Sequence, residues 1–383
     1  MDTEPGTAAR VAGPAELIGL DELRLAARNH GMPLEALRYP VTPPGLHYVL
    51  THYDIPDIDP VRWRLTVDGA VRRPLRLSRT DLAVRPRRTL RVTLECAGNG
   101  RARLVPRPIS QPWLDEAVGT ADWTGTPLAD LLREAGVADG ARTVVCTGAD
   151  HGTERGVEQD YRRALPLAEA LRDEVLLADE MNGAPLPPQH GFPLRLVVPG
   201  WYGMAQVKWL TAITVLAGEY DGFQNAVAYR IKRDADEPGT PVTRIRPRAL
   251  LVPPGYPDFL SRTRYLPAGD HLLSGRAWSG TGPVVRVEFR AGGDWTDADL
   301  EPPADRFAWR AFTVRWRATP GRYELNVRAT DATGRVQPVE PPWNLQGMAN
   351  NMAQQIPVVV RPDVREGTVC DDDSGPDAPG SAA

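Results

Sequence analysis

The stretch Thr89–Arg101, which reads TLRVTLECAGNGR, constrains the fold and the chemistry of this chain more than any other. Its first half alternates apolar and polar side chains, which predicts a half-buried strand with Leu90, Val92 and Leu94 on the buried face. Small residues end the alternation, so the strand should deliver Cys96 to the start of a turn. Glycines in that turn allow backbone angles that other residues avoid, and main-chain N–H groups can then approach an anionic ligand closely.

Three roles are open to a single cysteine on such a turn. It can act as a nucleophile, as a soft metal ligand or as a buried structural residue. The first two roles need the thiolate, and Arg101 favours the thiolate because it places a positive charge nearby. The stretch by itself leaves all three roles open for Cys96.

Further strings along the chain decide between these roles. Glu95–Arg101 (ECAGNGR) resembles the molybdenum-binding motif of the sulfite oxidase family. Other strings resemble the same family in the same order: Gly119–Gly125 (GTADWTG), Glu180–Gly183 (EMNG), His190–Arg195 (HGFPLR), Val198–Leu210 (VPGWYG and VKWL) and Pro342–Gly347 (PWNLQG). Because ordered strings spread from about residue 52 to residue 361 are not expected by chance, the chain is identified as a member of this family of molybdopterin-dependent oxidoreductases.

The pattern of the chain predicts two domains. Residues 16–234 mix strand and helix signals, which is typical of an α+β domain. Helices are expected at 17–28, 127–135 and 167–172, and strands at Trp63–Val67 and Arg195–Val198. In the second of these helices, Pro127 suits the first turn and Gly136 suits the end.

Residues 235–362 show short alternating strands between Gly, Pro and Asp turns, which predicts a β-sandwich. The resemblance implies the same division: a mixed α+β molybdopterin-binding domain followed by an all-β immunoglobulin-like domain that mediates dimerisation. Residues 1–15 and the acidic tail 363–383 are predicted to be disordered, because they contain few groups that could build a core.

Composition excludes several classes of protein. The 45 basic and 49 acidic residues give a net charge of −4, which does not indicate a nucleic-acid partner. No apolar run approaches the ~18 residues of a membrane span, and the first residues show no basic-then-apolar leader, so a cytoplasmic protein without membrane association is expected. Three cysteines do not make a disulfide framework; Cys146 lies in an apolar strand and Cys370 in the acidic tail.

The resemblance implies a molybdenum–molybdopterin cofactor. Its metal is held by a pterin dithiolene and by one cysteine, which here is Cys96; a soft thiolate suits a metal that changes oxidation state. The positions matching those that hold the pterin and its phosphate are His52, Asp150, His190, Arg195 and Lys208. Taken as single residues, the histidines could equally be buried core residues, and Arg195 part of a structural ion pair.

The resemblance also implies a substrate pocket. Arg101 matches the arginine after the cysteine turn, Trp113 a pocket-lining tryptophan, Tyr229 a tyrosine near the metal, and Arg310 an arginine from the second domain. Two arginines would give an oxyanion charge-assisted hydrogen bonds. For Trp113, ordinary core packing is an equal alternative.

The chain departs from the family pattern at Leu50 and Ala205, where the family carries arginine. An apolar side chain at position 50 weakens the case for tight binding of sulfite and leaves the cofactor assignment untouched. The sequence also lacks a haem-binding segment and any cysteine cluster for iron–sulfur. We therefore expect a bacterial-type member without a haem domain, which exchanges electrons with a separate partner.

These observations predict a homodimeric molybdenum oxidoreductase that transfers an oxygen atom between water and a small sulfur oxyanion such as sulfite. A reductase of a sulfoxide or of nitrate on the same molybdenum site is the alternative. The residues alone also permit a metal-free enzyme with Cys96 as nucleophile and His52 or His190 as base. A non-catalytic module, resting only on the sandwich domain, is the remaining class.

Overall fold

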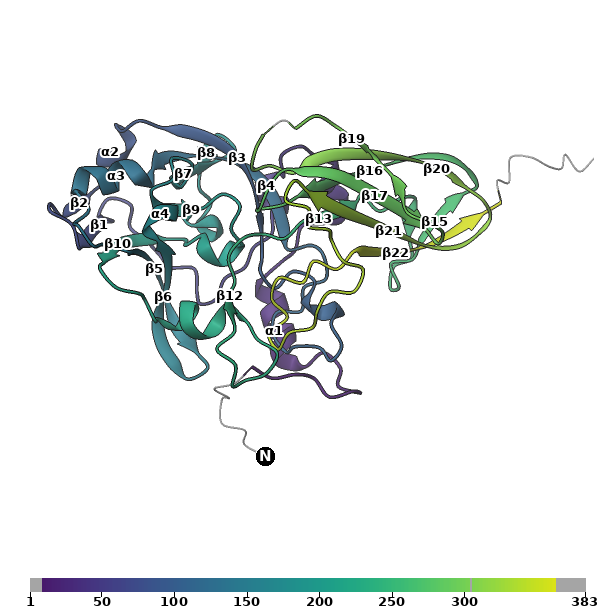
Figure 1. Ribbon diagram of the computed structural model, residues 1–383, viewed down its shortest axis with the longest axis horizontal. Helices are drawn as coiled ribbons and strands as arrows, with labels where there is room; N and C mark the ends of the chain where they lie inside the picture. The colour runs from purple at the N-terminus through teal and green to yellow at the C-terminus, as the bar shows by residue number, and fades with distance from the viewer. Residues whose placement is uncertain (1–8, 304, 363–383) are drawn as a thin grey trace, which may run out of the picture.

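The computed structural model describes residues 9–303 and 305–362, which form two lobes joined side by side (Figure 1). The first lobe combines two sheets with short helices, and the second lobe consists of strands. Within the described residues, none of the helices has the length and apolar character needed to cross a membrane. The predicted tail 363–383, with Cys370, lies outside the described residues.

Two sheets build the first lobe. One has the order β2-β1-β10-β5-β6, with β1 and β10 parallel and the other neighbours antiparallel. Its strands are β1 (Leu65–Gly69), β2 (Leu75–Leu77), β5 (Thr143–Glu154), β6 (Val157–Pro166) and β10 (Leu210–Leu216). The other sheet has the order β3-β4-β7-β8, and β9 also pairs with β7. Its strands are β3 (Arg88–Glu95), β4 (Val118–Pro127), β7 (Leu176–Met181), β8 (Ala184–Pro185) and β9 (Arg195–Val197).

The helices of this lobe are short, and they are α1 (Leu20–Arg28), α2 (Arg79–Ala83), α3 (Leu128–Ala135) and α4 (Leu167–Ala170). Helix α3 lies where the sequence predicts it: Leu128, Leu131 and Leu132 are fully buried, and Gly136 ends the helix with a φ of 69°. Helix α1 starts three residues later than expected, and α4 ends two residues earlier.

The second lobe has two sheets that share one hydrophobic core. The four-stranded sheet contains β13 (Arg248–Leu251), β16 (Gly269–Trp278), β20 (Arg310–Ala318) and β19 (Asp299–Leu300). The six-stranded sheet contains β14 (Tyr256–Pro257), β15 (Arg264–Pro267), β22 (Gln354–Arg361), β21 (Gly321–Asp331), β17 (Val284–Ala291) and β18 (Thr296–Asp297). Side chains such as Phe312 and Leu325 meet between these sheets, so the predicted sandwich is present. A small ribbon of β11 (Arg230–Ile231) and β12 (Thr240–Pro241) precedes it.

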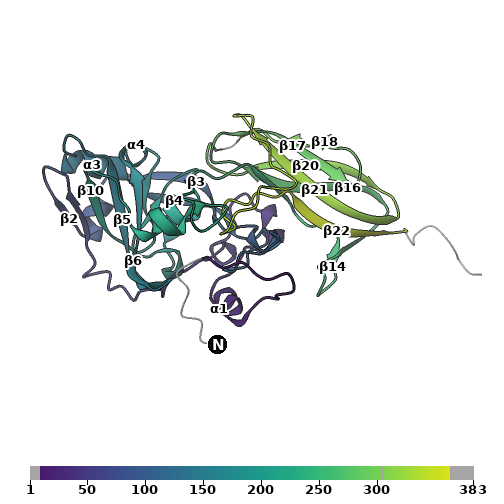
Figure 2. The ribbon, with the colours of Figure 1, turned by 60° about the horizontal axis from the view of Figure 1, so that its bottom comes forward.

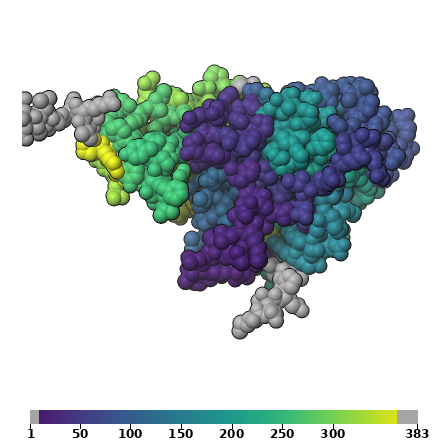
Figure 3. All heavy atoms as spheres, turned by 180° about the vertical axis from the view of Figure 1, so that it is seen from behind, coloured from purple at the N-terminus to yellow at the C-terminus, as the bar shows by residue number. Residues whose placement is uncertain are grey.

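The N-terminal segment corrects one expectation. Residues 9–15, predicted as disordered, are ordered where Val11 forms a bridge with Pro108 and the Ala12 N–H donates to the Arg107 carbonyl at 2.8 Å. Seen from behind, the chain from residue 9 to about residue 50 lies across the junction of the two lobes (Figure 3). Composition could not show this, because the segment gains its order from a partner almost a hundred residues away.

Candidate active site

Strand β3 carries Cys96 to the turn that the sequence predicts. The Gly98 N–H donates to the Cys96 sulfur at 3.4 Å, and the Asn99 N–H donates to the Cys96 carbonyl at 3.0 Å. A Cβ on Gly98 would lie 2.8 Å from the guanidinium carbon of Arg101, so only glycine lets that side chain pack beneath the turn. Gly100 has a φ of 87°, which glycine adopts without strain.

The second lobe holds this turn through Glu95, the residue before the cysteine. Glu95 accepts hydrogen bonds from Asn99 Nδ2 at 3.1 Å and Trp278 Nε1 at 2.8 Å, and it pairs with Arg248 Nε at 2.8 Å. Arg248 and Trp278 belong to β13 and β16, and the side chains of Glu95 and Arg248 are only 1% exposed. The turn that carries Cys96 is therefore fixed by groups of the sandwich lobe.

Two cavities meet at Cys96. The first lies within the first lobe, and the second opens toward the N-terminal segment. The residues that line both are Leu50, His52, Cys96 and Tyr229. The thiol thus stands where a group in one cavity can face a molecule in the other.

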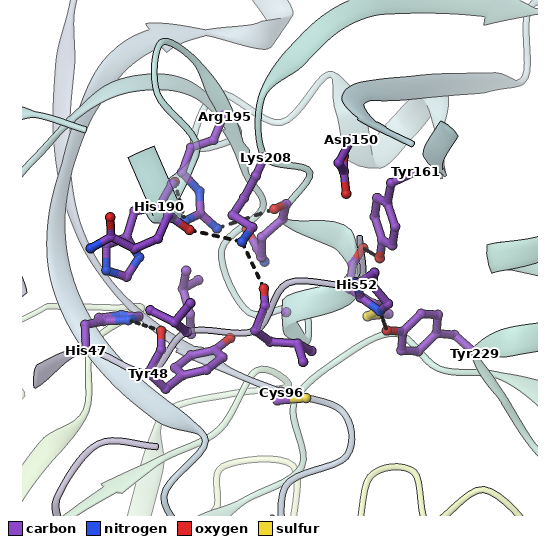
Figure 4. A pocket seen from close by; sticks show the side chains of 17 residues that line it. His47, Tyr48, His52, Cys96, Asp150, Tyr161, His190, Arg195, Lys208 and Tyr229 are labelled. Atoms are coloured by element: carbon purple, nitrogen blue, oxygen red, sulfur yellow. Dashed lines mark hydrogen bonds between the residues drawn. The ribbon is translucent and has the colours of Figure 1, made fainter. Parts of the chain in front are cut away.

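Positively charged groups gather on one side of the first cavity (Figure 4). Lys208 Nζ donates to the carbonyls of Leu50 at 2.9 Å and Gln189 at 3.0 Å, and Arg195 Nη1 donates to the His190 carbonyl at 3.0 Å. Burial lowers the pKa of Lys208 to about 7 and that of Arg195 to about 10. Both cations would be more stable beside an anion, such as a phosphate, that repays this desolvation.

Several polar atoms of this cavity lack a protein partner. His47 Nε2, Asp150 Oδ1 and Arg195 Nε are buried and have no hydrogen-bond partner among the described residues. Buried polar groups are normally satisfied, so donors and acceptors arranged in this way fit a polar ligand such as a pterin with a phosphate. Burial raises the pKa of Asp150 to about 6 and lowers that of His47 to about 4.

The second cavity contains a buried cation next to the thiol. Arg101 donates to the carbonyls of Gln346 at 2.8 Å and Gln111 at 3.3 Å and contacts the Met348 sulfur, and none of the described carboxylates forms an ion pair with it. Trp113 lines the same cavity, and its Nε1 has no partner among the described residues.

The His52–Tyr229 pair lies at the boundary between the two cavities. His52 Nε2 and Tyr229 Oη lie 2.7 Å apart. Burial lowers the pKa of His52 and raises that of Tyr229 well above its ordinary value, so the imidazole is neutral and the phenol keeps its proton. The pair can therefore share the phenol proton in the hydrogen bond between the two side chains, beside Cys96.

The structure modifies one expectation about the thiol. Burial raises the pKa of Cys96, and the positive charge of Arg101 opposes this rise without reversing it. Cys96 also forms no hydrogen bond with His52 or His190 in the described part of the chain. The metal-free nucleophile hypothesis therefore loses support, whereas bonding to a metal would remove the thiol proton outright.

The structure brings together all but one of the predicted site residues. Arg310 lies at the start of β20, where it donates to the carbonyls of Glu301 and Val284 (2.8 Å to Val284), and it lines neither cavity. Sequence reasoning missed His47, which lies five residues before His52 and shares its cavity. The only available signal was a second histidine in the same short string.

A buried thiol between a cationic polar cavity and a second cavity with a buried arginine fits a cofactor-dependent oxidoreductase. Comparisons with protein-family models support this class. Residues 52–224 match the oxidoreductase molybdopterin binding domain, and residues 258–361 match the Mo-co oxidoreductase dimerisation domain. The protein therefore carries a molybdenum–molybdopterin cofactor.

Known proteins show where the chain belongs. Human mitochondrial sulfite oxidase is 33% identical over 352 residues, covering 84% of this chain and 62% of the human protein. Chicken sulfite oxidase is 34% identical over 344 residues, covering 80% and 71%. Barley nitrate reductase is 32% identical over 343 residues, covering 81% and 38%. The sulfane dehydrogenase SoxCD of Paracoccus pantotrophus superposes with a TM-score of 0.75 at 25% identity, covering 89% and 90%. The chain belongs to the sulfite oxidase family and spans 62% of the length of its human relative.

Proposed function

We propose that this protein oxidises a small sulfur oxyanion such as sulfite, with oxygen supplied from water and electrons passed to a separate acceptor. The observation that carries the proposal is Arg101, a buried guanidinium beside Cys96 without a carboxylate partner among the described residues. A buried cation of this kind is stabilised by an anion, and substrate oxygens can meet that need.

The residues of the chain divide the work between the two cavities. Lys208 and Arg195 would hold the anionic end of the cofactor, Cys96 would bind its metal, and Arg101 would orient the substrate from the other side. When bound, the cofactor supplies the two-electron redox chemistry. The His52–Tyr229 pair keeps a proton close to the reacting group, and both side chains lie at the boundary of the cavities.

Steady-state kinetics test this proposal. Arg101→Gln keeps hydrogen-bonding capacity and removes the charge, so kcat/KM for sulfite with an artificial acceptor should fall about ten- to a hundredfold, with molybdenum content preserved. Arg133→Gln is the matched control, because Arg133 is exposed on α3 and lines neither cavity. An unchanged sulfite kcat/KM in Arg101→Gln would contradict the assignment of Arg101 as a ligand of the substrate oxyanion.

A reductase of a sulfoxide or of nitrate is the second candidate. It is favoured by the similarity to a nitrate reductase and by Leu50, an apolar side chain at the boundary where the family pattern has a cation. Methionine sulfoxide and nitrate, assayed with a reduced donor, test it on the same preparations. A neutral sulfoxide turned over equally well by wild type and Arg101→Gln, with poor sulfite turnover in both, would favour this candidate.

We also propose that residues 235–362 form an immunoglobulin-like sandwich that joins two copies of the chain. The match of residues 258–361 to a dimerisation domain supports this assembly. A permanent interface usually buries ~2,000 Å² or more. Sedimentation at micromolar concentration should show a dimer, and a strictly monomeric profile would contradict the proposal.

A further inference from the structure

The tip of the β5–β6 hairpin forms part of the second cavity. The strands pair up to Glu154 and Val157, and a two-residue turn, Arg155–Gly156, joins them. The hairpin extends from the first lobe, away from the body of the sheet (Figures 1 and 2). Glu154 and Arg155 line the second cavity together with Arg101 and Cys96.

The backbone at Arg155 is strained. Its φ is 50° and that of Gly156 is 77°, so both central residues of the turn are left-handed, as in a type I′ hairpin turn. Such turns favour Asn-Gly, whereas an arginine at the first position raises the free energy of the folded chain. Strain of this kind concentrates at ligand-binding sites, where the side chain has a purpose other than stability.

The guanidinium of Arg155 forms no ion pair with any described residue, although the Glu154 carboxylate lines the same cavity. Arg10 also lines the cavity, but it pairs with Glu16, and Glu154 accepts a hydrogen bond from Gln224 Nε2 at 3.0 Å. Arg155 has no hydrogen bond or ion pair with any residue that the structure describes, and it is only partly exposed.

The charges of Arg155 and Arg101 interact across the second cavity. Burial is the main cause that lowers the pKa of Arg101; the positive charge of Arg155 lowers it further, and the Glu154 carboxylate in the same cavity opposes this to a smaller extent. Two like charges that face one cavity repel each other, and an anion between them would relieve this repulsion. Leu50, which lies on the boundary of the same cavity, contributes no charge.

We propose that Arg155 is a specificity-determining residue that supplies the second positive charge of the substrate cavity and binds the oxyanion together with Arg101. The inference rests on the proposed function, because it takes the substrate to be an anion. It assigns the role of the missing cation at position 50 to a different element of the fold, the tip of a hairpin.

Sulfate binding by the holoenzyme tests the proposal without turnover. Isothermal titration calorimetry should give a sulfate Kd about tenfold weaker for Arg155→Gln than for wild type. The sulfite KM should rise by a similar factor, with kcat within about twofold, because the interaction serves capture. Arg162→Gln, on the same hairpin and paired with Asp160 outside the cavity, is the matched control and should leave the sulfate Kd unchanged.

Arg155→Asn separates binding from folding. Asparagine accepts the left-handed backbone, so the unfolding temperature should stay equal or rise while sulfate binding weakens as in Arg155→Gln. A lower unfolding temperature in this variant would refute the strain that motivates the inference.

The outcomes are distinguishable from those of the proposed function. If Arg101→Gln weakens sulfate binding and Arg155→Gln does not, Arg155 is no ligand and the proposed function stands. If wild type neither binds sulfate nor oxidises sulfite, the proposed function fails, and the role of Arg155 fails with it.

Discussion

Removing Arg248 should loosen the turn that carries Cys96. This side chain comes from β13 of the sandwich lobe, is 1% exposed, and pairs with Glu95 at 2.8 Å. It also pairs with Asp115 at 3.3 Å and donates to the carbonyls of Asn99 and Asn350. We choose Arg248→Met, which keeps most of the length and removes the charge.

The expected loss of stability follows from the carboxylates that remain after Arg248 is replaced. Asp115 keeps a second partner, Arg103, at 2.6 Å, whereas Glu95 loses its only ion pair among the described residues. Leaving a buried charge uncompensated costs about 3–5 kcal/mol. Arg248→Met should therefore lower the free energy of unfolding by about this amount. Because Glu95 directly precedes Cys96, we also expect molybdenum content to fall.

Removing Glu95 at the same time should recover much of that loss. In the Glu95→Gln background no carboxylate is stranded at this position, so Arg248→Met should cost about 2–3 kcal/mol less than in wild type. Arg246→Met is the control for loss of a nearby arginine, because Arg246 donates to the Ala349 carbonyl and pairs with none of the described carboxylates.

The effect should depend on pH. Burial raises the pKa of Glu95, so the folded state binds its proton more tightly than the unfolded state, and the carboxylate contributes less stability as pH rises through this range. Loss of Arg248 raises that pKa further. The difference between wild type and Arg248→Met should therefore be larger at pH 8 than at pH 5.

Urea unfolding, followed by both tryptophan fluorescence and circular dichroism, measures these differences. Two probes are needed because a two-domain chain need not unfold in one step. Equal losses for Arg248→Met in the wild-type and Glu95→Gln backgrounds would refute the reasoning, since the pair would then show no coupling.

Three further predictions concern the cofactor cavity. Cys96→Ser should keep the fold and lose turnover, because a hydroxyl is a harder ligand than a thiolate; metal analysis and a sulfite assay check this, and near-normal activity with molybdenum bound would exclude Cys96 as ligand. In the cofactor-free protein, burial lowers the pKa of Lys208 from 10.5 to about 7, so the unfolded state binds more protons between these values and the stability contribution of Lys208 rises with pH. Lys208→Met should flatten that dependence in urea unfolding at pH 7 to 9, and an identical slope would count against it. In Gly119→Ala the new Cβ would lie 2.5 Å from the His47 ring, so molybdenum content should fall, whereas Gly218→Ala, with nothing within 4 Å, should leave it unchanged; equal contents in the two variants would show that the ring position does not matter.

Local sequence patterns were sufficient to predict much of the secondary structure and the family. The alternation up to Leu94 predicts β3, and the leucines between Pro127 and Gly136 predict α3, because the period of a strand or helix depends on neighbouring residues. The string Glu95–Arg101 and the other strings that resemble the family are likewise continuous, so the family and the cofactor could be inferred from them together. The division into two domains followed from the change of pattern near residue 235.

Tertiary structure decided the properties that depend on distant contacts. The pKa of Cys96 is raised because burial outweighs the charge of Arg101, and burial is set by the whole fold. Arg310 was predicted to reach the substrate pocket, yet packing shows that it begins β20, donates to the Val284 carbonyl and lies outside both cavities. Arg155 belongs to a string with no family motif, and the hairpin alone brings it to the second cavity. The sequence gives the order of residues along the chain. The electrostatic potential at a buried thiol, in contrast, is the sum of contributions from every charged and polar group that the fold places around it.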